Sequence, residues 1–144
     1  MPAIGAVLLC LVVGISDGDT LTARCDGVQE QVKVRLAEID APEKKQPWGQ
    51  RSKESLSEMC YMKRAELRVI AHDRYKRTVA RVICDETDAN REQINRGMAW
   101  VYDKYVKDVS LYDVQREAKE SKLGLWGDSE PIPPWEWRHR EPRK

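Results

Sequence analysis

The chain has 144 residues, enough for one domain with a substantial hydrophobic core. Its 25 basic and 24 acidic residues nearly cancel, which excludes the blanket positive charge of proteins that coat DNA without specificity. Any affinity for nucleic acid must therefore come from a local patch. Five Trp and five Tyr occur with no Phe, so every aromatic side chain carries a polar tip, which suits base stacking or a barrel rim.

The chain begins with an apolar segment, Ala3 to Val13. It is about as long as the core of a signal peptide and too short for a bilayer-spanning helix of ~20 residues. No basic residue precedes it and no small-x-small cleavage site follows it before Asp17, so its removal stays open. We interpret residues 1–11 as a remnant export signal leading into the first strand. We expect an exported protein, periplasmic or secreted, without stable membrane association.

Asp17-Gly18-Asp19-Thr20 follows this run, and Asp-Gly between alternating segments is a strong hairpin signal. With Asp17 and Gly18 as the two turn residues, Cys10 and Cys25 would face each other at disulfide distance.

The four cysteines lack the Cys-x-x-Cys spacing of structural zinc sites. If Cys10 pairs with Cys25, Cys60 and Cys84 form the remaining pair, as an oxidising compartment would favour. Four buried free thiols are the alternative.

The segment Val32 to Leu36 alternates apolar and charged residues, which predicts a strand with Arg35 on its polar face. Asp40, Ala41, Pro42 and Glu43 follow as a turn. Because Pro42 favours an extended conformation at Ala41, the Ala41 carbonyl is free to point away from the sheet.

Periodicity predicts the remaining elements in chain order. These are a helix over Gln50 to Tyr61, strands over Glu66 to Ile70 and Thr78 to Cys84, a helix from Asp88 through Arg96, and a last helix carrying Leu111, Val114 and Ala118 and stopped by Gly124. An α+β fold follows, a five-stranded OB-type β-barrel with three helices over residues 12–127. Residues 128–144 form a Pro/Trp/Arg-rich tail in which the prolines oppose regular structure. Its basic end consists of Arg138, Arg140, Arg143 and Lys144.

The charged residues at the strand ends suggest one site, if their three segments meet. Asp19 and Asp40 with a main-chain carbonyl are hard oxygen ligands that suit Ca²⁺ or Mg²⁺ and leave room for water and substrate. Arg35 and Arg77 could grip phosphate oxygens with fork geometry. Glu43 would then be free to orient or deprotonate the attacking water.

These motifs resemble the staphylococcal nuclease (thermonuclease) family. The resemblance lies in Asp-Gly-Asp-Thr at 17–20, Val-Arg-Leu followed by Ile-Asp-Ala-Pro-Glu within 34–43, and Asp-Arg-Tyr-Lys-Arg at 73–77. It continues through Asn-Arg-Gly-Met-Ala at 95–99 and Lys-Leu-Gly-Leu-Trp at 122–126 in the expected order.

The resemblance implies a calcium-dependent endonuclease for DNA and RNA, which cleaves the 5′ P–O bond, leaves 3′-phosphate ends and prefers single strands. Asp19, Asp40 and the Ala41 carbonyl would bind Ca²⁺, and Glu43 would handle the attacking water. The scissile phosphate would be contacted by Arg35 and Arg77, and a neighbouring phosphate by Tyr75.

The sequence departs from the family at several positions. Lys76 stands where a glycine is common, and Asp103 stands where a base-stacking tyrosine is expected, so Tyr102 or Tyr105 would replace it. Together with Tyr75, these tyrosines and Arg74 are our candidate substrate-binding residues. We expect a monomer. The alternative function is a non-catalytic OB module that binds nucleic acid or protein.

Overall fold

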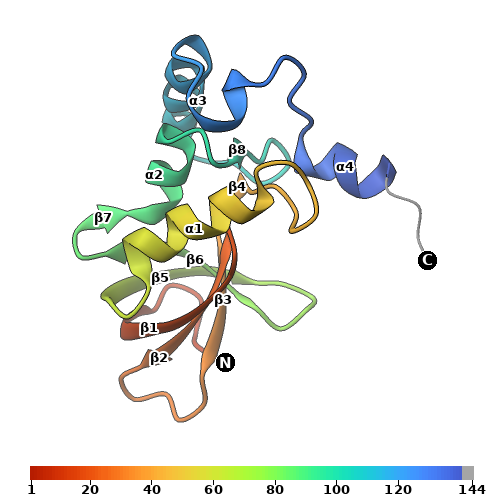
Figure 1. The fold of residues 1–144 in the computed structure, drawn as a ribbon. Coiled ribbons are helices and arrows are strands. Elements are labelled where there is room, and N and C mark those ends of the chain that lie inside the picture. Colours follow the sequence, from red (N-terminus) through yellow and green to blue (C-terminus); the bar gives the residue numbers. More distant parts are fainter. Residues whose placement is uncertain (141–144) are drawn as a thin grey trace.

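The computed structural model describes residues 1–140. Its main sheet has the strand order β3-β2-β1-β5-β6-β7, and a parallel pairing of β3 with β6 closes five of these strands into a barrel (Figure 1). The bounds are β1 Val7–Asp17, β2 Thr20–Cys25, β3 Val32–Leu36, β5 Arg64–His72, β6 Thr78–Cys84 and β7 Thr87–Asp88. Two short strands, β4 (Ile39–Asp40) and β8 (Trp100–Val101), pair separately. The α+β OB-type fold is confirmed.

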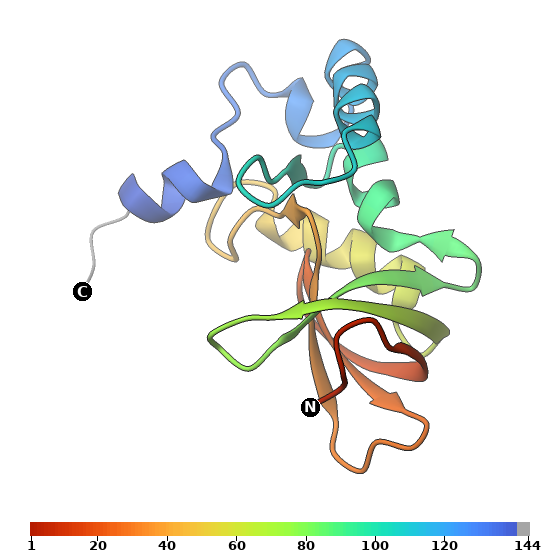
Figure 2. The ribbon, with the colours of Figure 1, turned by 180° about the vertical axis from the view of Figure 1, so that it is seen from behind.

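The helices are α1 (Gly49–Cys60), α2 (Ala89–Asn95), α3 (Ser110–Glu120) and α4 (Pro134–Arg140), with a 3₁₀ turn, η1, at Gly124–Gly127. The first three match the predicted helices. Helix α1 lies across one end of the barrel, with α2 and α3 beyond it, whereas α4 lies beside the loop between β4 and α1 (Figures 1 and 2). None of the helices within residues 1–140 is long and apolar enough to cross a membrane.

Alternation in the strands fills the barrel with apolar side chains. In β3 the even-numbered residues are buried and Lys33 is exposed, as the sequence pattern predicted. The interior of the barrel contains the fully buried Val12, Leu21, Val34, Leu67 and Val82. This rigid core fixes the strand ends that carry the charged residues.

The hairpin turn lies one residue later than predicted. Asp17 pairs with Thr20, so the turn residues are Gly18 and Asp19. Two irregularities in β1 then shift the register, and Cys10 faces Cys25 after all. Both favoured disulfides, Cys10–Cys25 and Cys60–Cys84, are formed.

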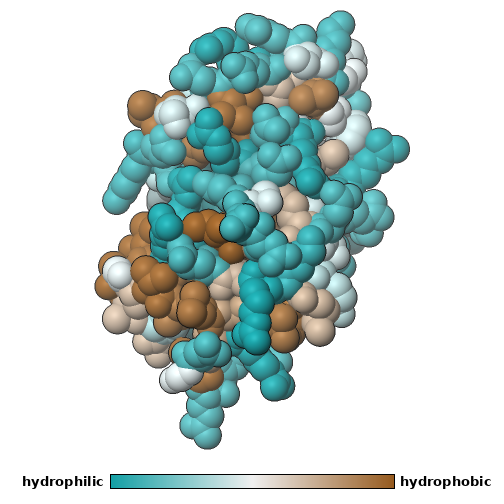
Figure 3. Space-filling model, turned by 90° about the vertical axis from the view of Figure 1, so that its left-hand side faces the viewer, coloured by the Kyte–Doolittle hydropathy of each residue, from teal (hydrophilic) through white to brown (hydrophobic). Residues whose placement is uncertain are grey.

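Both terminal regions of the described residues 1–140 are more regular than we predicted. Strand β1 begins at Val7, so residues 7–11 pair with β5, and Cys10 and Leu11 pair also with β2, although we had placed them before the barrel. Met1, Ile4, Val7 and Leu9 are exposed, and a hydrophobic area appears at the lower, β1 and β2 end of an otherwise mostly hydrophilic face (Figure 3).

The prediction of an irregular tail was wrong. Pro134 is the first residue of α4, where its missing N–H costs no helical hydrogen bond. Of the predicted basic end, Arg143 and Lys144 lie outside the described residues.

Candidate active site

The predicted carboxylates meet around the guanidinium of Arg35. Its Nη2 lies 3.4 Å from Asp19 Oδ2 and 3.4 Å from Asp40 Oδ1. The strand pairing explains this meeting, because Thr20 is the register partner of Arg35 and β4 follows β3 after two residues. Asp19 and Asp40 are 6% and 1% exposed, so both carboxylates lie at the edge of the core.

Arg35 also shapes the turn that presents Asp40. Its Nη1 donates to the carbonyl oxygens of Leu36, at 2.7 Å, and Ile39, at 2.9 Å. Glu38, between them, adopts a positive φ of 69°. One guanidinium thus closes the β3–β4 turn and faces two carboxylates.

Hydrogen bonds to Asp19 bring the Ala41 main chain to the same place. Asp19 Oδ2 accepts from the Ala41 amide at 2.8 Å, and Asp19 Oδ1 accepts from the Thr20 hydroxyl at 3.0 Å. Gly18 makes this approach feasible, since a Cβ there would lie 1.8 Å from Ser52 Oγ and 2.8 Å from Ala41 Cβ. The Asp-Gly-Asp turn is therefore packed against the predicted metal-binding segment.

The site holds more negative charge than its local cations balance. Burial, reinforced by Asp19, raises the pKa of Asp17 to about 7. Burial likewise raises the pKa of Asp40 to about 6, against the hydrogen bond from Arg138 and the charge of Arg35. Burial opposes ionisation of Asp19 too, but Arg35 and several hydrogen bonds hold the pKa of Asp19 below its ordinary value. Asp17 is a member of this cluster that the sequence reasoning had treated only as a turn residue.

Glu43 lies beside the cluster and faces a residue we had not predicted. Arg138 of α4 donates through Nη1 to Glu43 Oε1 at 2.6 Å and through Nη2 to Asp40 Oδ2 at 2.7 Å. The Glu43 amide donates to Gln46 Oε1 at 3.1 Å, which fixes the main chain at the turn. The basic composition of the tail was visible in the sequence, but no local pattern indicates a contact across 98 residues.

Arg77 lies in the connection between β5 and β6 and is paired locally. Its Nε donates to Asp73 Oδ2 at 2.7 Å, and its guanidinium stands 5.4 Å from the Tyr75 ring centre. Arg74 packs against the same ring at 5.1 Å. Lys76 adopts a positive φ of 63°, a conformation that favours glycine. Among the described contacts, Arg77 is joined to Asp73 and not to Asp19 or Asp40.

The candidate tyrosines after β8 form a small aromatic group. The rings of Tyr102 and Tyr105 meet edge to face at 5.0 Å, and Trp135 of α4 is stacked on Tyr102 at 5.6 Å with an interplanar angle of 3°. Asp103, which replaces the expected base-stacking tyrosine, accepts a hydrogen bond from Tyr112. Tyr102 lies close to the site because Asp40 pairs with Trp100, two residues earlier.

The described residues contain no group of three or more His, Cys, Asp or Glu side chains arranged to hold a metal ion. The donors present nevertheless fit a hard cation. Asp19 and Asp40 converge on one guanidinium nitrogen, the Ala41 main chain adjoins Asp19, and burial raises the pKa of Asp40, a cost that a bound cation would offset. These three residues would hold the ion, with water and substrate completing its shell.

Comparisons with known proteins identify the family of the chain. The model of the family described as "Staphylococcal nuclease homologue" matches residues 33–128. An uncharacterized endonuclease of Haemophilus influenzae is 47% identical over 132 residues, which cover 92% of this chain and 74% of that protein. An uncharacterized endonuclease of Escherichia coli O157:H7 is 39% identical, covering 90% and 84%, and a micrococcal nuclease of Shigella flexneri is 35% identical, covering 88% and 78%. The chain belongs to the staphylococcal nuclease family.

Proposed function

We propose that this protein is a calcium-dependent endonuclease that hydrolyses phosphodiester bonds in DNA and RNA. The observation that carries the proposal is the convergence of Asp19 and Asp40 on Arg35, with Glu43 beside them, in a chain whose relatives are named as nucleases. Buried carboxylates that share a guanidinium form a rigid site for a cation and a phosphate.

The side chains have distinct roles in this proposal. The bound cation would supply Lewis-acid polarisation of a phosphate oxygen. Arg35 is held by two carbonyl oxygens and has Nη2 directed at the carboxylates, so this nitrogen is placed to donate to a phosphate that enters there. Glu43, 38% exposed, is accessible to water and can take up a proton from it. Attack of that water on phosphorus forms a new P–O bond and breaks the bond to the 5′ oxygen, which takes up a proton and leaves as a 5′-hydroxyl, so that a 3′-phosphate remains.

The aromatic group supports a preference for single strands. Tyr102, Tyr105 and Trp135 carry planar faces near Asp40, and bases that are not paired in a duplex can stack on such faces. Two disulfides support an oxidising location, so we retain export to the periplasm or the medium as part of the proposal.

The test is cleavage of end-labelled single-stranded DNA, duplex DNA and RNA with calcium or with an excess of chelator. We expect cleavage only with calcium, fastest on single strands, and products that a polymerase extends only after phosphatase treatment. Glu43→Gln should lower kcat by roughly 100-fold or more, whereas Glu120→Gln, an exposed control on α3, should leave kcat unchanged. Tight binding of the oligonucleotide without cleavage would instead favour a binding module.

A further inference from the structure

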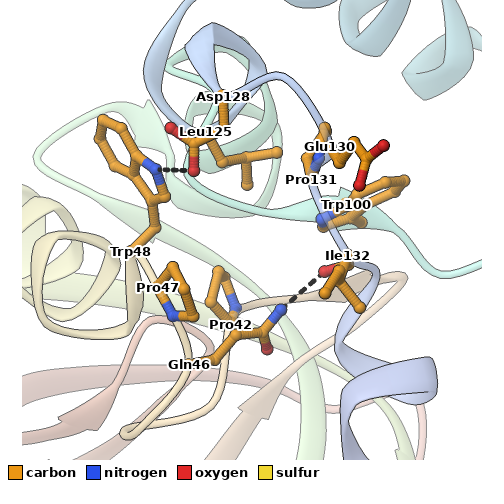
Figure 4. Close-up of a pocket in the computed structure, with 10 residues that line it drawn as sticks. All are labelled: Pro42, Gln46, Pro47, Trp48, Trp100, Leu125, Asp128, Glu130, Pro131 and Ile132. Carbon is orange, nitrogen blue, oxygen red and sulfur yellow. Dashed lines mark hydrogen bonds between the residues drawn. The ribbon is translucent and has the colours of Figure 1, made fainter.

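The tail that follows the barrel is fixed to the same loop that carries Glu43. Trp48 Nε1 donates to Asp128 Oδ2 at 2.9 Å, and Gln46 Nε2 donates to the Ile132 carbonyl at 2.6 Å (Figure 4). Both donors lie in the connection between β4 and α1, immediately after Glu43. The tail is therefore anchored before α4 begins.

A second set of contacts orients α4 itself. Trp135 is stacked on Tyr102 and meets Trp100 edge-on at 5.8 Å. Because Trp100 in β8 is the strand partner of Asp40 in β4, α4 packs against the strand next to β4. The tail is thus attached both to the connection after β4 and to the segment around β8. Trp135, which makes the second attachment, lies about one helical turn before Arg138.

Arg138 reaches the site from this anchored helix. Its Nη1 and Nη2 lie 3.2 and 2.7 Å from the two oxygens of Asp40, and Nη1 lies 2.6 Å from Glu43 Oε1. Arg35 approaches the same Asp40 carboxylate at 3.4 Å from within the barrel. Two guanidinium groups, those of Arg35 and Arg138, therefore flank one carboxylate.

A guanidinium in this position suits a phosphate. Carboxylate and phosphate oxygens accept the same paired N–H donors, so Arg138 can exchange one acceptor for the other by side-chain rotation while α4 stays in place. A nucleic-acid phosphate that approaches Asp19, Asp40 and Glu43 meets like charge, and a guanidinium beside them offsets that repulsion. The side chain is 38% exposed, so substrate has access to it.

We propose that Arg138 is a further catalytic residue, which binds the phosphate at the cleavage site together with Arg35. This inference rests on the proposed nuclease function. It assigns to the C-terminal helix, which lies beyond the matched family domain of residues 33–128, a direct part in the reaction.

The test compares the wild type with Arg138→Ala, Arg138→Lys and Arg140→Ala in calcium-dependent cleavage of a single-stranded oligonucleotide. Arg140 is an exposed residue of the same helix, so its replacement removes an equal charge. We expect Arg138→Ala to lower kcat by roughly 100-fold, Arg138→Lys to recover only a small part because it lacks the fork, and Arg140→Ala to stay within about twofold of wild type. Added guanidinium ion at millimolar concentration should restore part of the activity of Arg138→Ala, which a purely structural role of the residue would not allow.

Binding without turnover gives a second readout. In a Glu43→Gln background, fluorescence anisotropy should show roughly tenfold weaker oligonucleotide binding when Arg138 is replaced by alanine. Faster cleavage by Arg138→Ala would show that the guanidinium blocks the site, and unchanged cleavage and affinity would show that it is a bystander; either result overturns the inference. If the wild type itself binds but does not cleave, the proposed function fails, and the anisotropy comparison still decides whether Arg138 contacts phosphate.

Discussion

The replacement Arg35→Met tests how far the site depends on one guanidinium. Methionine keeps the apolar stem but removes donors to Leu36 O and Ile39 O and the ion pairs with Asp19 and Asp40. Each main-chain acceptor left unmatched costs about 1–3 kcal/mol, and the two carboxylates then repel each other without a bridging cation. We expect the free energy of unfolding to fall by about 3–5 kcal/mol at pH 8 in the presence of a chelator.

The loss should be smaller at low pH. The pKa of Asp40 is already raised to about 6, and removal of Arg35 favours its protonated form further. Between its ordinary pKa of 3.8 and this raised value, the folded protein binds more protons than the unfolded chain, so lowering the pH stabilises the fold. At pH 5 the variant should regain a large part of the deficit.

Urea unfolding followed by tryptophan fluorescence at pH 8 and pH 5 measures both quantities. Lys33→Met, on the exposed face of the same strand, is the matched control and should change stability by no more than about 0.5 kcal/mol. A loss for Arg35→Met below about 1 kcal/mol at pH 8, or the same loss at both pH values, would refute the reasoning.

Three other changes test the parts of the fold that support the site. Replacing Cys60 and Cys84 by alanine should lower the free energy of unfolding by about 3 kcal/mol, measured by urea unfolding, because a loop of 24 residues is no longer closed in the unfolded chain. A smaller effect than 1 kcal/mol would contradict this view. Gly18→Ala should lower both stability and cleavage, since its Cβ would lie 1.8 Å from Ser52 Oγ; a Tm and a rate equal to wild type would show that the turn is not tightly packed. Asn90→Ala should cost about 3 kcal/mol in the same unfolding assay, because this buried amide makes three hydrogen bonds to main-chain groups, and a loss under 1 kcal/mol would argue against that role.

Local sequence patterns predicted most of the barrel and much of the site. Alternation in β3 correctly placed Arg35 on the polar face of that strand, because it depends on short-range geometry, whereas Asp40, predicted in a turn, belongs to the short strand β4 that pairs with β8. The hairpin turn was displaced by one residue, since the irregularities in β1 depend on pairing with β2, which no local pattern reveals.

The structure of the tail could not be predicted from the sequence because it depends on long-range packing. The prolines were interpreted as breakers of regular structure, yet Pro134 begins α4, whose orientation comes from the stacking of Trp135 on Tyr102. The approach of Arg138 to Asp40 follows from that packing, and so does not appear as a motif. The local pairing of Arg77 with Asp73 was likewise not predicted, because an Asp and an Arg four residues apart in a connecting segment can equally well point apart.

The most direct test of the central claim is the dependence of cleavage rate on free calcium in the wild type and in Asp19→Asn. The wild-type rate should rise to saturation with calcium and vanish in chelator, and the variant should require a much higher calcium concentration because one buried carboxylate ligand has lost its charge. An undiminished rate in chelator, or an identical calcium requirement for both proteins, would contradict the assignment of this carboxylate cluster as a metal-dependent active site.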